Sequence, residues 1–186
     1  MAGVSYNESD DTTLITASLT GDKTAFTVIV NRYSNMVART VKGMIGDNAS
    51  AEDIGQEVFI KLYYSLKHFR GDSKLSTYIH RIAVNLTLNE LKKNKRVNTS
   101  TTDSDFESLK VMQVSGDDQI SRNETKELVD KALQLLEPKY RSVIVMRMLQ
   151  GYDTKETAEA LGLPIGTVLS RLSRAQEQMR KILGKL

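Results

Sequence analysis

Apolar residues recur every three or four positions along most of this 186-residue chain. That spacing is typical of helices that bury one face. It is clearest in "AEDIGQEVFIKLYYSL", where Ile54, Val58, Leu62 and Leu66 form an i, i+4 ladder. The sequence has no internal repeat and no strand-like alternation of useful length. The spacing therefore predicts an all-α fold.

Glycines and polar breaks divide the N-terminal part into four helices. Gly21 is predicted to end a short helix, "TTLITASLTG", and Gly46 a long one, "DKTAFTVIVNRYSNMVARTVKGMIG". Ser50 and Asp53 have the spacing of an N-cap pair for the third helix. A break at "KHFRGDSK" separates it from a fourth helix, "LSTYIHRIAVNLTLNELKKNKR". The sequence thus predicts a four-helix domain over residues 1–96.

Residues 97–120 lose the helical periodicity and are rich in Ser, Thr and Asp. Such a composition predicts an acidic, flexible linker. Helical periodicity returns after it and continues to the end of the chain, which predicts a second helical domain over residues 121–186. The predicted fold is therefore two helical domains joined by a flexible linker.

Charge follows the same division of the chain. Residues 61–96 carry nine Lys and Arg against two acids, and residues 131–186 carry ten against five. Between them, residues 97–130 carry eight acids against three bases. Two basic segments suggest a polyanionic partner such as nucleic acid. A solvated helix face explains the same charges, so charge alone leaves the question open.

The residue inventory disfavours enzyme chemistry. The chain has no cysteine and only two histidines, which leaves little to hold a metal or to act as a thiol nucleophile. No phosphate-binding loop and no cluster of nucleophile and base is visible. We expect a protein with no catalytic centre, metal or cofactor. The polar, acidic N-terminus and the absence of a long apolar run predict a cytoplasmic protein without membrane insertion.

The stretch "KETAEALGLPIGTVLSRLSRA" predicts two helices joined by a tight turn. Asp153 and Glu156 are placed to cap the first helix, Gly162 permits the turn, and Pro164 starts the second. In the second helix the apolar residues are predicted to form one buried stripe: Ile165, Val168, Leu169, Leu172, Met179 and Leu183. Helical geometry places the polar residues on the opposite side: Thr167, Ser170, Arg171 and Arg174.

An ordinary helical hairpin with a basic face would have a similar pattern. Two helices around a Gly turn, with small polar and Arg residues at the start of the second, favour a helix-turn-helix that enters the major groove of DNA. There Arg binds O6 and N7 of guanine, while Thr and Ser bond phosphate or base edges.

The longer run "PKYRSVIVMRMLQGYDTKETAEALGLPIGTVLSRLSRAQEQMRKIL" resembles region 4 of the extracytoplasmic-function (ECF) sigma factors, small sigma subunits of bacterial RNA polymerase. Its most specific part is "GTV-x-SRL-x-RA". The segments "GDKTAFTVIVNRY", "SAEDIGQEVFIKLYYSLKHFRG" and "RIAVNLTLNELKKNKR" resemble successive parts of region 2. Together these motifs cover about 150 of the 186 residues. The resemblance implies an alternative sigma factor that binds core RNA polymerase and directs promoter-specific initiation, with no catalytic centre of its own.

The same resemblance implies roles for named residues. The third helix would dock on the clamp helices of the polymerase beta-prime subunit through Asp53, Gln56, Glu57 and Phe59. Melted minus-10 DNA would be held, with His80 as a further planar side chain, by a larger set: Phe69, Arg70, Lys74, Tyr78, Arg81, Asn85, Lys92 and Lys93. The minus-35 duplex would be bound by Thr167, Ser170, Arg171 and Arg174. An anti-sigma factor is a further expected partner.

Departures from the family pattern affect these expectations. Tyr78 stands where Trp is usual, Leu75 occupies a loop position that is often aromatic, and Leu169 replaces a frequent basic residue. We expect Leu169 to pack inward. Two alternatives stay open: a helix-turn-helix regulator that acts without core polymerase, and a sigma-like decoy for an anti-sigma factor. The first leaves the region 2 motifs without a role, and a decoy would be expected to lose Arg171 and Arg174.

Overall fold

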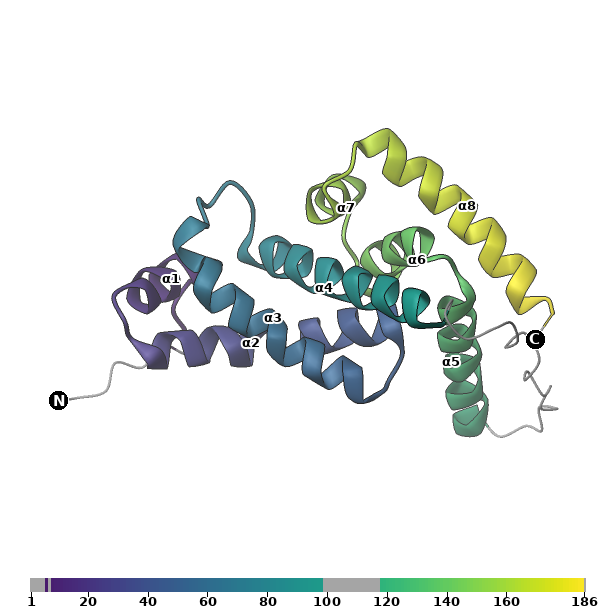
Figure 1. The fold of residues 1–186 in the computed structure, drawn as a ribbon, viewed down its shortest axis with the longest axis horizontal. Coiled ribbons are helices and arrows are strands. Elements are labelled where there is room, and N and C mark those ends of the chain that lie inside the picture. The colour runs from purple at the N-terminus through teal and green to yellow at the C-terminus, as the bar shows by residue number, and fades with distance from the viewer. Residues whose placement is uncertain (1–5, 7, 99–117, 186) are drawn as a thin grey trace.

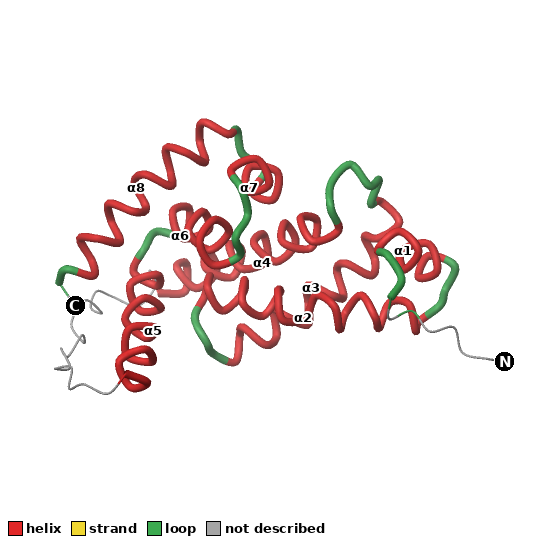
Figure 2. The backbone as a smooth tube through the Cα atoms, turned by 180° about the vertical axis from the view of Figure 1, so that it is seen from behind, coloured by secondary structure: helices red, strands yellow, loops and turns green. Residues whose placement is uncertain are grey.

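The computed structural model describes residues 6, 8–98 and 118–185, and every regular element in these ranges is a helix (Figure 1). The predicted all-α fold is confirmed. Most of the predicted linker, residues 99–117, lies outside the described residues. The helices form two groups, α1 to α4 and α5 to α8, which contact each other through α2 and α4; Figure 2 shows the path of the chain through them.

The N-terminal group contains α1 (Asp11–Leu19), α2 (Lys23–Ile45), α3 (Ala49–Ser65) with a 3-10 turn (Leu66–His68), and α4 (Leu75–Asn98). Gly46 ends α2 with a φ of 85°, which is favourable only for glycine. The predicted ladder of Ile54, Val58, Leu62 and Leu66 is buried in the core. The predicted N-cap of α3 was wrong: Asn48, not Ser50, accepts a hydrogen bond from the Ala51 N–H at 3.1 Å, because α3 starts at Ala49.

The C-terminal group contains α5 (Asp118–Leu135), α6 (Pro138–Ile144) with a π-helical turn (Val145–Leu149), α7 (Thr154–Leu161) and α8 (Ile165–Leu183). Helix α5 starts three residues before the predicted boundary at 121. Pro138 is the first residue of α6, where its missing N–H costs nothing. A small core of Leu133, Leu136, Tyr140, Ile144 and Ala175 holds α5, α6 and α8 together.

The two groups share a buried apolar cluster. Met44 of α2 and Val84 of α4 pack against Val145, Met146 and Ala160 of the C-terminal group. The backbone of α2 at Gly43 lies close to Val145, because a Cβ at Gly43 would lie 3.0 Å from a methyl group of Val145. This packing fixes the end of α2 against the π-helical turn.

Arg141 joins the same two groups through hydrogen bonds. Its buried guanidinium donates to the Met44 carbonyl at the end of α2, to both oxygens of Gln134, and to the Leu136 carbonyl at 2.8 Å. Gln134 in turn donates to the Gly43 carbonyl at 3.3 Å. Burial lowers the pKa of Arg141 to about 10, so the group stays charged at neutral pH. The Gly43 and Met44 carbonyls near the end of α2 are thus satisfied from the other half of the molecule.

Candidate nucleic-acid interface

The predicted helix-turn-helix is present in α7 and α8. Asp153 accepts from the Glu156 N–H at 2.8 Å, and the Glu156 carboxylate accepts from the Asp153 N–H at 3.0 Å, which confirms the capping box. Gly162 turns the chain in the left-handed conformation, with φ 63° and ψ 40°. Pro164 precedes the first residue of α8. Buried Ala158 lies against Val143 and Val168, so the two helices pack closely.

The buried stripe of α8 differs from the predicted one. Val168 and Ala175 are buried, whereas Ile165, Leu169 and Leu183 are 50%, 52% and 40% exposed. Helix α8 packs on α5, α6 and α7, and these contacts centre the stripe on Val168 and Ala175. The prediction that Leu169 packs inward was therefore wrong. An apolar side chain at the margin of a helical stripe does not by itself show to which side it belongs.

The outward face of α8 follows from this orientation. A step of about 100° per residue places Gly166, Ser170 and Ser173 opposite the buried stripe, with Arg174 beside them, and all four residues are exposed. Thr167 and Arg171 are half-buried on a flank of the helix. Of the predicted minus-35 residues, Ser170 and Arg174 thus face solvent together. The sequence interpretation missed Gly166 and Ser173. A helical projection with the buried stripe centred on Val168 and Ala175 would have placed both on the outward face.

The predicted minus-10 residues gather around the start of α4. Phe69 and Tyr78 are half-buried, and their ring centroids lie 5.2 Å apart. Arg70, Lys74, Arg81 and Asn85 are exposed, as are Lys92 and Lys93 farther along the helix. Leu75 is buried at the first position of α4, so this departure from the family pattern serves the core.

His80 does not belong to this surface, which corrects its assignment. Its side chain is buried between α4 and the loop before α7, edge-on to the Tyr152 ring with centroids 4.7 Å apart. The ring Nδ1 lies 3.1 Å from the Ser76 carbonyl oxygen. Burial, assisted by the charge of Arg39, lowers the pKa of His80 from its ordinary 6.5 to about 4. His80 is therefore a neutral residue of the contact between the two groups.

This burial predicts an acid-sensitive fold. The pKa of His80 is lower in the folded protein than in the unfolded chain, so the unfolded chain binds the proton first as the pH falls from about 6.5 to 4. The free energy of unfolding should drop by about 2 kcal/mol between pH 7 and pH 5 through this group. Urea titrations of wild type and His80→Asn at both pH values measure the difference. His68→Asn, at an exposed position, is the control; an equal pH response in wild type and His80→Asn would contradict the prediction.

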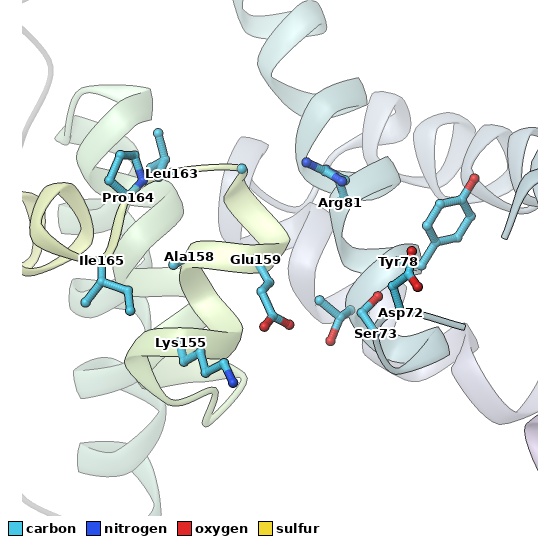
Figure 3. Close-up of a pocket in the computed structure, with 12 residues that line it drawn as sticks. Asp72, Ser73, Tyr78, Arg81, Lys155, Ala158, Glu159, Leu163, Pro164 and Ile165 are labelled. Carbon is cyan, nitrogen blue, oxygen red and sulfur yellow. The ribbon is translucent and has the colours of Figure 1, made fainter. Parts of the chain in front are cut away.

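Two of the predicted minus-10 residues, Tyr78 and Arg81, face the turn of the helix-turn-helix across an open cleft of about 650 Å³. Figure 3 shows Tyr78 and Arg81 on one wall, and Lys155, Glu159 and Ile165 on the other. Lys74 forms an ion pair with Glu156 at 2.8 Å. An Arg81 nitrogen lies only 3.1 Å from where a Cβ of Gly162 would be. In this arrangement Lys74 is paired with Glu156 of α7, and Arg81, although exposed, lies close to the turn after α7.

Helix α3 presents a second exposed surface. Asp53, Gln56 and Glu57 face solvent, while Phe59 is half-buried against the N-terminal core. The same face continues with Ile60, Tyr63 and Tyr64, which are 56%, 46% and 71% exposed. Edge-to-face contacts join Tyr63 to Phe26 at 5.0 Å and to Tyr64 at 5.6 Å. We call these six solvent-facing residues of α3 the α3 face: Asp53, Gln56, Glu57, Ile60, Tyr63 and Tyr64.

The sequence interpretation missed the apolar half of the α3 face. Ile60 and Tyr64 follow Asp53 and Glu57 at helical spacing, and that signal could have revealed them. Among the described residues, no cluster of His, Asp and Glu suited to a metal ion is present. Within the same ranges, no helix is long and apolar enough to cross a bilayer.

Comparison with known proteins identifies the family of this chain. Residues 29–97 match the family model for Sigma-70 region 2, and residues 126–179 match that for Sigma-70 region 4. The chain is 31% identical to the RNA polymerase sigma-H factor of Pseudomonas aeruginosa, over 96% of each protein. It is 34% identical to the ECF RNA polymerase sigma-E factor of Escherichia coli, over 90% of this chain and 91% of that protein.

Solved structures share the fold. CnrH, in complex with the cytosolic domain of CnrY, has a TM-score of 0.68 at 21% identity and covers 94% of this chain and 97% of its own. The sigma factor RpoE of Bartonella quintana, in complex with the anti-sigma factor NepR, has a TM-score of 0.65 at 21% identity, over 86% of this chain and 96% of its own. On the sequence matches above, this chain belongs to the ECF family of sigma-70-type RNA polymerase sigma factors, which are initiation factors and not enzymes.

Proposed function

We propose that the protein attaches to core RNA polymerase through the α3 face, captures the minus-10 element with the loop before α4 and with α4, and reads the minus-35 duplex with α8. The observation that carries the proposal is that one chain exposes both a helix-turn-helix recognition face and a separate, partly apolar helix face. A regulator that needs only DNA has no use for the second surface. In this proposal residues 1–96 and 121–186 are the two functional domains, and residues 97–120 are the linker between them.

The chemistry of the α3 face suits a basic, partly apolar helix of the polymerase. Asp53 and Glu57 supply carboxylates and Gln56 an amide, which bond well to Arg side chains. Ile60 and Tyr64 add apolar area, and buried Tyr residues often dominate interface energies. Phe59 packs on the N-terminal core beside the α3 face and so helps to hold α3 in place.

The region around the start of α4 suits melted DNA. The paired rings of Phe69 and Tyr78 offer a surface on which an unpaired base can stack. Arg70, Lys74 and Arg81 supply positive charge for the phosphates. Asn85 is exposed on the same helix, and its amide can bond a base edge.

Two lysines near the end of α4 are proposed to contact phosphates without reading sequence. The Lys92→Ala/Lys93→Ala variant should weaken binding to all promoters by a similar factor. The slope of log affinity against log salt should become shallower by about 1.4 to 1.8. Lys23→Ala, at an exposed lysine at the start of α2, is the control. A change of promoter preference in the double variant would show that these lysines read sequence instead.

In this proposal we expect promoter binding to separate α7 from α4, because Lys74 is paired with Glu156 of α7 and Arg81 lies close to the turn after α7. The sequence has no cysteine, so labels can be placed at Thr20→Cys in the N-terminal group and Gln176→Cys in the C-terminal group, both exposed. Energy transfer between the labels should change when core polymerase and promoter are added. An unchanged transfer would mean that the two groups stay together on the promoter.

An anti-sigma factor is a proposed partner. Two proteins with this fold are known in complexes, one with the cytosolic domain of CnrY and the other with the anti-sigma factor NepR. A protein that serves core polymerase acts in the cytoplasm, which is the proposed location.

Run-off transcription tests the proposed function. Core polymerase is supplied with this protein and with promoter fragments from upstream of its own gene. We expect initiation at a defined start that depends on the protein and is lost in Asp53→Ala/Gln56→Ala. Tight duplex binding by the protein alone, with no stimulation of core polymerase, would instead indicate a conventional helix-turn-helix regulator. If neither activity appears, the proposal is rejected in favour of a decoy.

A further inference from the structure

The recognition helix exposes two large apolar side chains near its start. Ile165 and Leu169 are 50% and 52% exposed, although α8 buries other apolar residues against α5, α6 and α7. They are one helical turn apart, so they are neighbours on the helix surface. The core therefore does not explain why these two residues are apolar.

Leu169 borders the outward face of α8. At about 100° per residue, it lies about 40° from Ser173 and about 60° from Gly166, and Ser170 follows it in the chain. Ile165 lies farther from that face, and it is among the residues that line the cleft. Leu169 is thus the large apolar side chain nearest to the exposed hydroxyls of Ser170 and Ser173.

The major groove offers one apolar group to such a side chain. Thymine carries a C5-methyl there, while the other groove edges of the bases are hydrogen-bond donors and acceptors. A leucine held at the base edges by Ser170 and Arg174 cannot satisfy a donor or an acceptor. Contact with a thymine methyl removes apolar surface of both partners from water, and this contributes to affinity only at that base.

We propose that Leu169 is a specificity-determining residue that reads a thymine in the minus-35 duplex by packing against its C5-methyl. The assignment rests on the proposed function, because it needs α8 in the major groove. It adds one apolar contact to the polar contacts of Ser170 and Arg174.

Uracil in place of thymine tests the contact, since uracil lacks only that methyl group. Holoenzyme formed from core polymerase and the full chain first selects its preferred sequence from promoters with a randomised minus-35 element. Each thymine of the selected element is then replaced singly by uracil, and the affinity of the holoenzyme is measured by competition. We expect one thymine at which uracil lowers the affinity about threefold to fourfold, the effect of losing one buried methyl.

The variants assign that effect to Leu169. Leu169→Ala should bind the thymine and uracil duplexes equally, and Leu169→Arg should also lose the methyl preference while steepening the salt dependence by about 0.9. Leu183→Ala makes the same change at an exposed leucine at the far end of α8 and should keep the full preference. Because Leu169 is exposed, neither substitution should disturb the fold, which circular dichroism checks.

Three results would overturn the assignment. The first is a selected element in which no replacement of thymine by uracil lowers the affinity. The second is a preference for thymine over uracil that persists in Leu169→Ala. The third is a preference that is lost in Ile165→Ala and in no other variant. Failure of the proposed function looks different, because the holoenzyme would then select no minus-35 sequence at all, and the assignment to Leu169 would fall with it.

Discussion

Arg141→Met should lower the free energy of unfolding by about 3 kcal/mol. Arg141 is 5% exposed, and its guanidinium donates to the carbonyls of Met44, Gln134 and Leu136 and to the Gln134 side chain. Methionine fills much of the volume but leaves these buried acceptors unpaired, and hydrogen bonds from a charged donor are the stronger kind. The midpoint of thermal unfolding should fall by about 6–12 °C. Calorimetry and urea titration measure both quantities.

Two matched variants separate the role of Arg141 from general effects of charge. Arg180→Met removes an exposed guanidinium from the last turn of α8 and should change stability by less than about 0.5 kcal/mol. Arg141→Lys keeps the charge but not the forked geometry, so we expect an intermediate loss. A cost below about 1 kcal/mol for Arg141→Met would show that the carbonyls find other partners and that this contact does not hold the two groups together.

Ile60→Ala/Tyr64→Ala should lower the affinity for core polymerase by about 30-fold or more. Both side chains are largely exposed in the free protein, at 56% and 71%, and lie on the α3 face with Asp53, Gln56 and Glu57. Truncation of a buried aromatic anchor at an interface typically has an effect of this size. Titration of the labelled protein with core polymerase gives the affinity, and run-off transcription gives the consequence for initiation.

The free protein supplies the control for this second prediction. Because Ile60 and Tyr64 are exposed, the double substitution should leave the thermal midpoint nearly unchanged. Tyr64→Phe keeps the ring and should retain most of the affinity, while Leu183→Ala, on the recognition helix, should bind core polymerase as wild type does. Unchanged polymerase affinity in Ile60→Ala/Tyr64→Ala would place the polymerase contact outside the apolar half of the α3 face.

Local features of the fold could be predicted because they depend on residues close together in the sequence. The ladder from Ile54 to Leu66, the end of α2 at Gly46 and the capping box of Asp153 and Glu156 all appear as expected. The N-cap of α3 was misplaced by two residues, since Asn48 and Ser50 are both capable acceptors and only the backbone shows which one is used.

The same reasoning applies to the candidate site. The turn at Gly162 and Pro164, and with it the recognition helix, was predicted from the sequence. Which residues of that helix face outward was only partly predicted, because Leu169 and Arg171 lie at the margins of the stripe. His80 was misassigned for a similar reason: nothing near it in the sequence shows that Tyr152 covers it.

The sequence by itself determined the helices, several of their ends, the helix-turn-helix and the family, because these are encoded in spacing and in short motifs. The tertiary structure alone decided the rotation of α8, the burial of His80 and the ion pair of Lys74 with Glu156 of α7. These depend on contacts such as that of Arg141 with Met44, 97 positions apart in the chain. Periodicity reports which face of a helix is apolar, but the partner that packs against it decides which residues are left exposed.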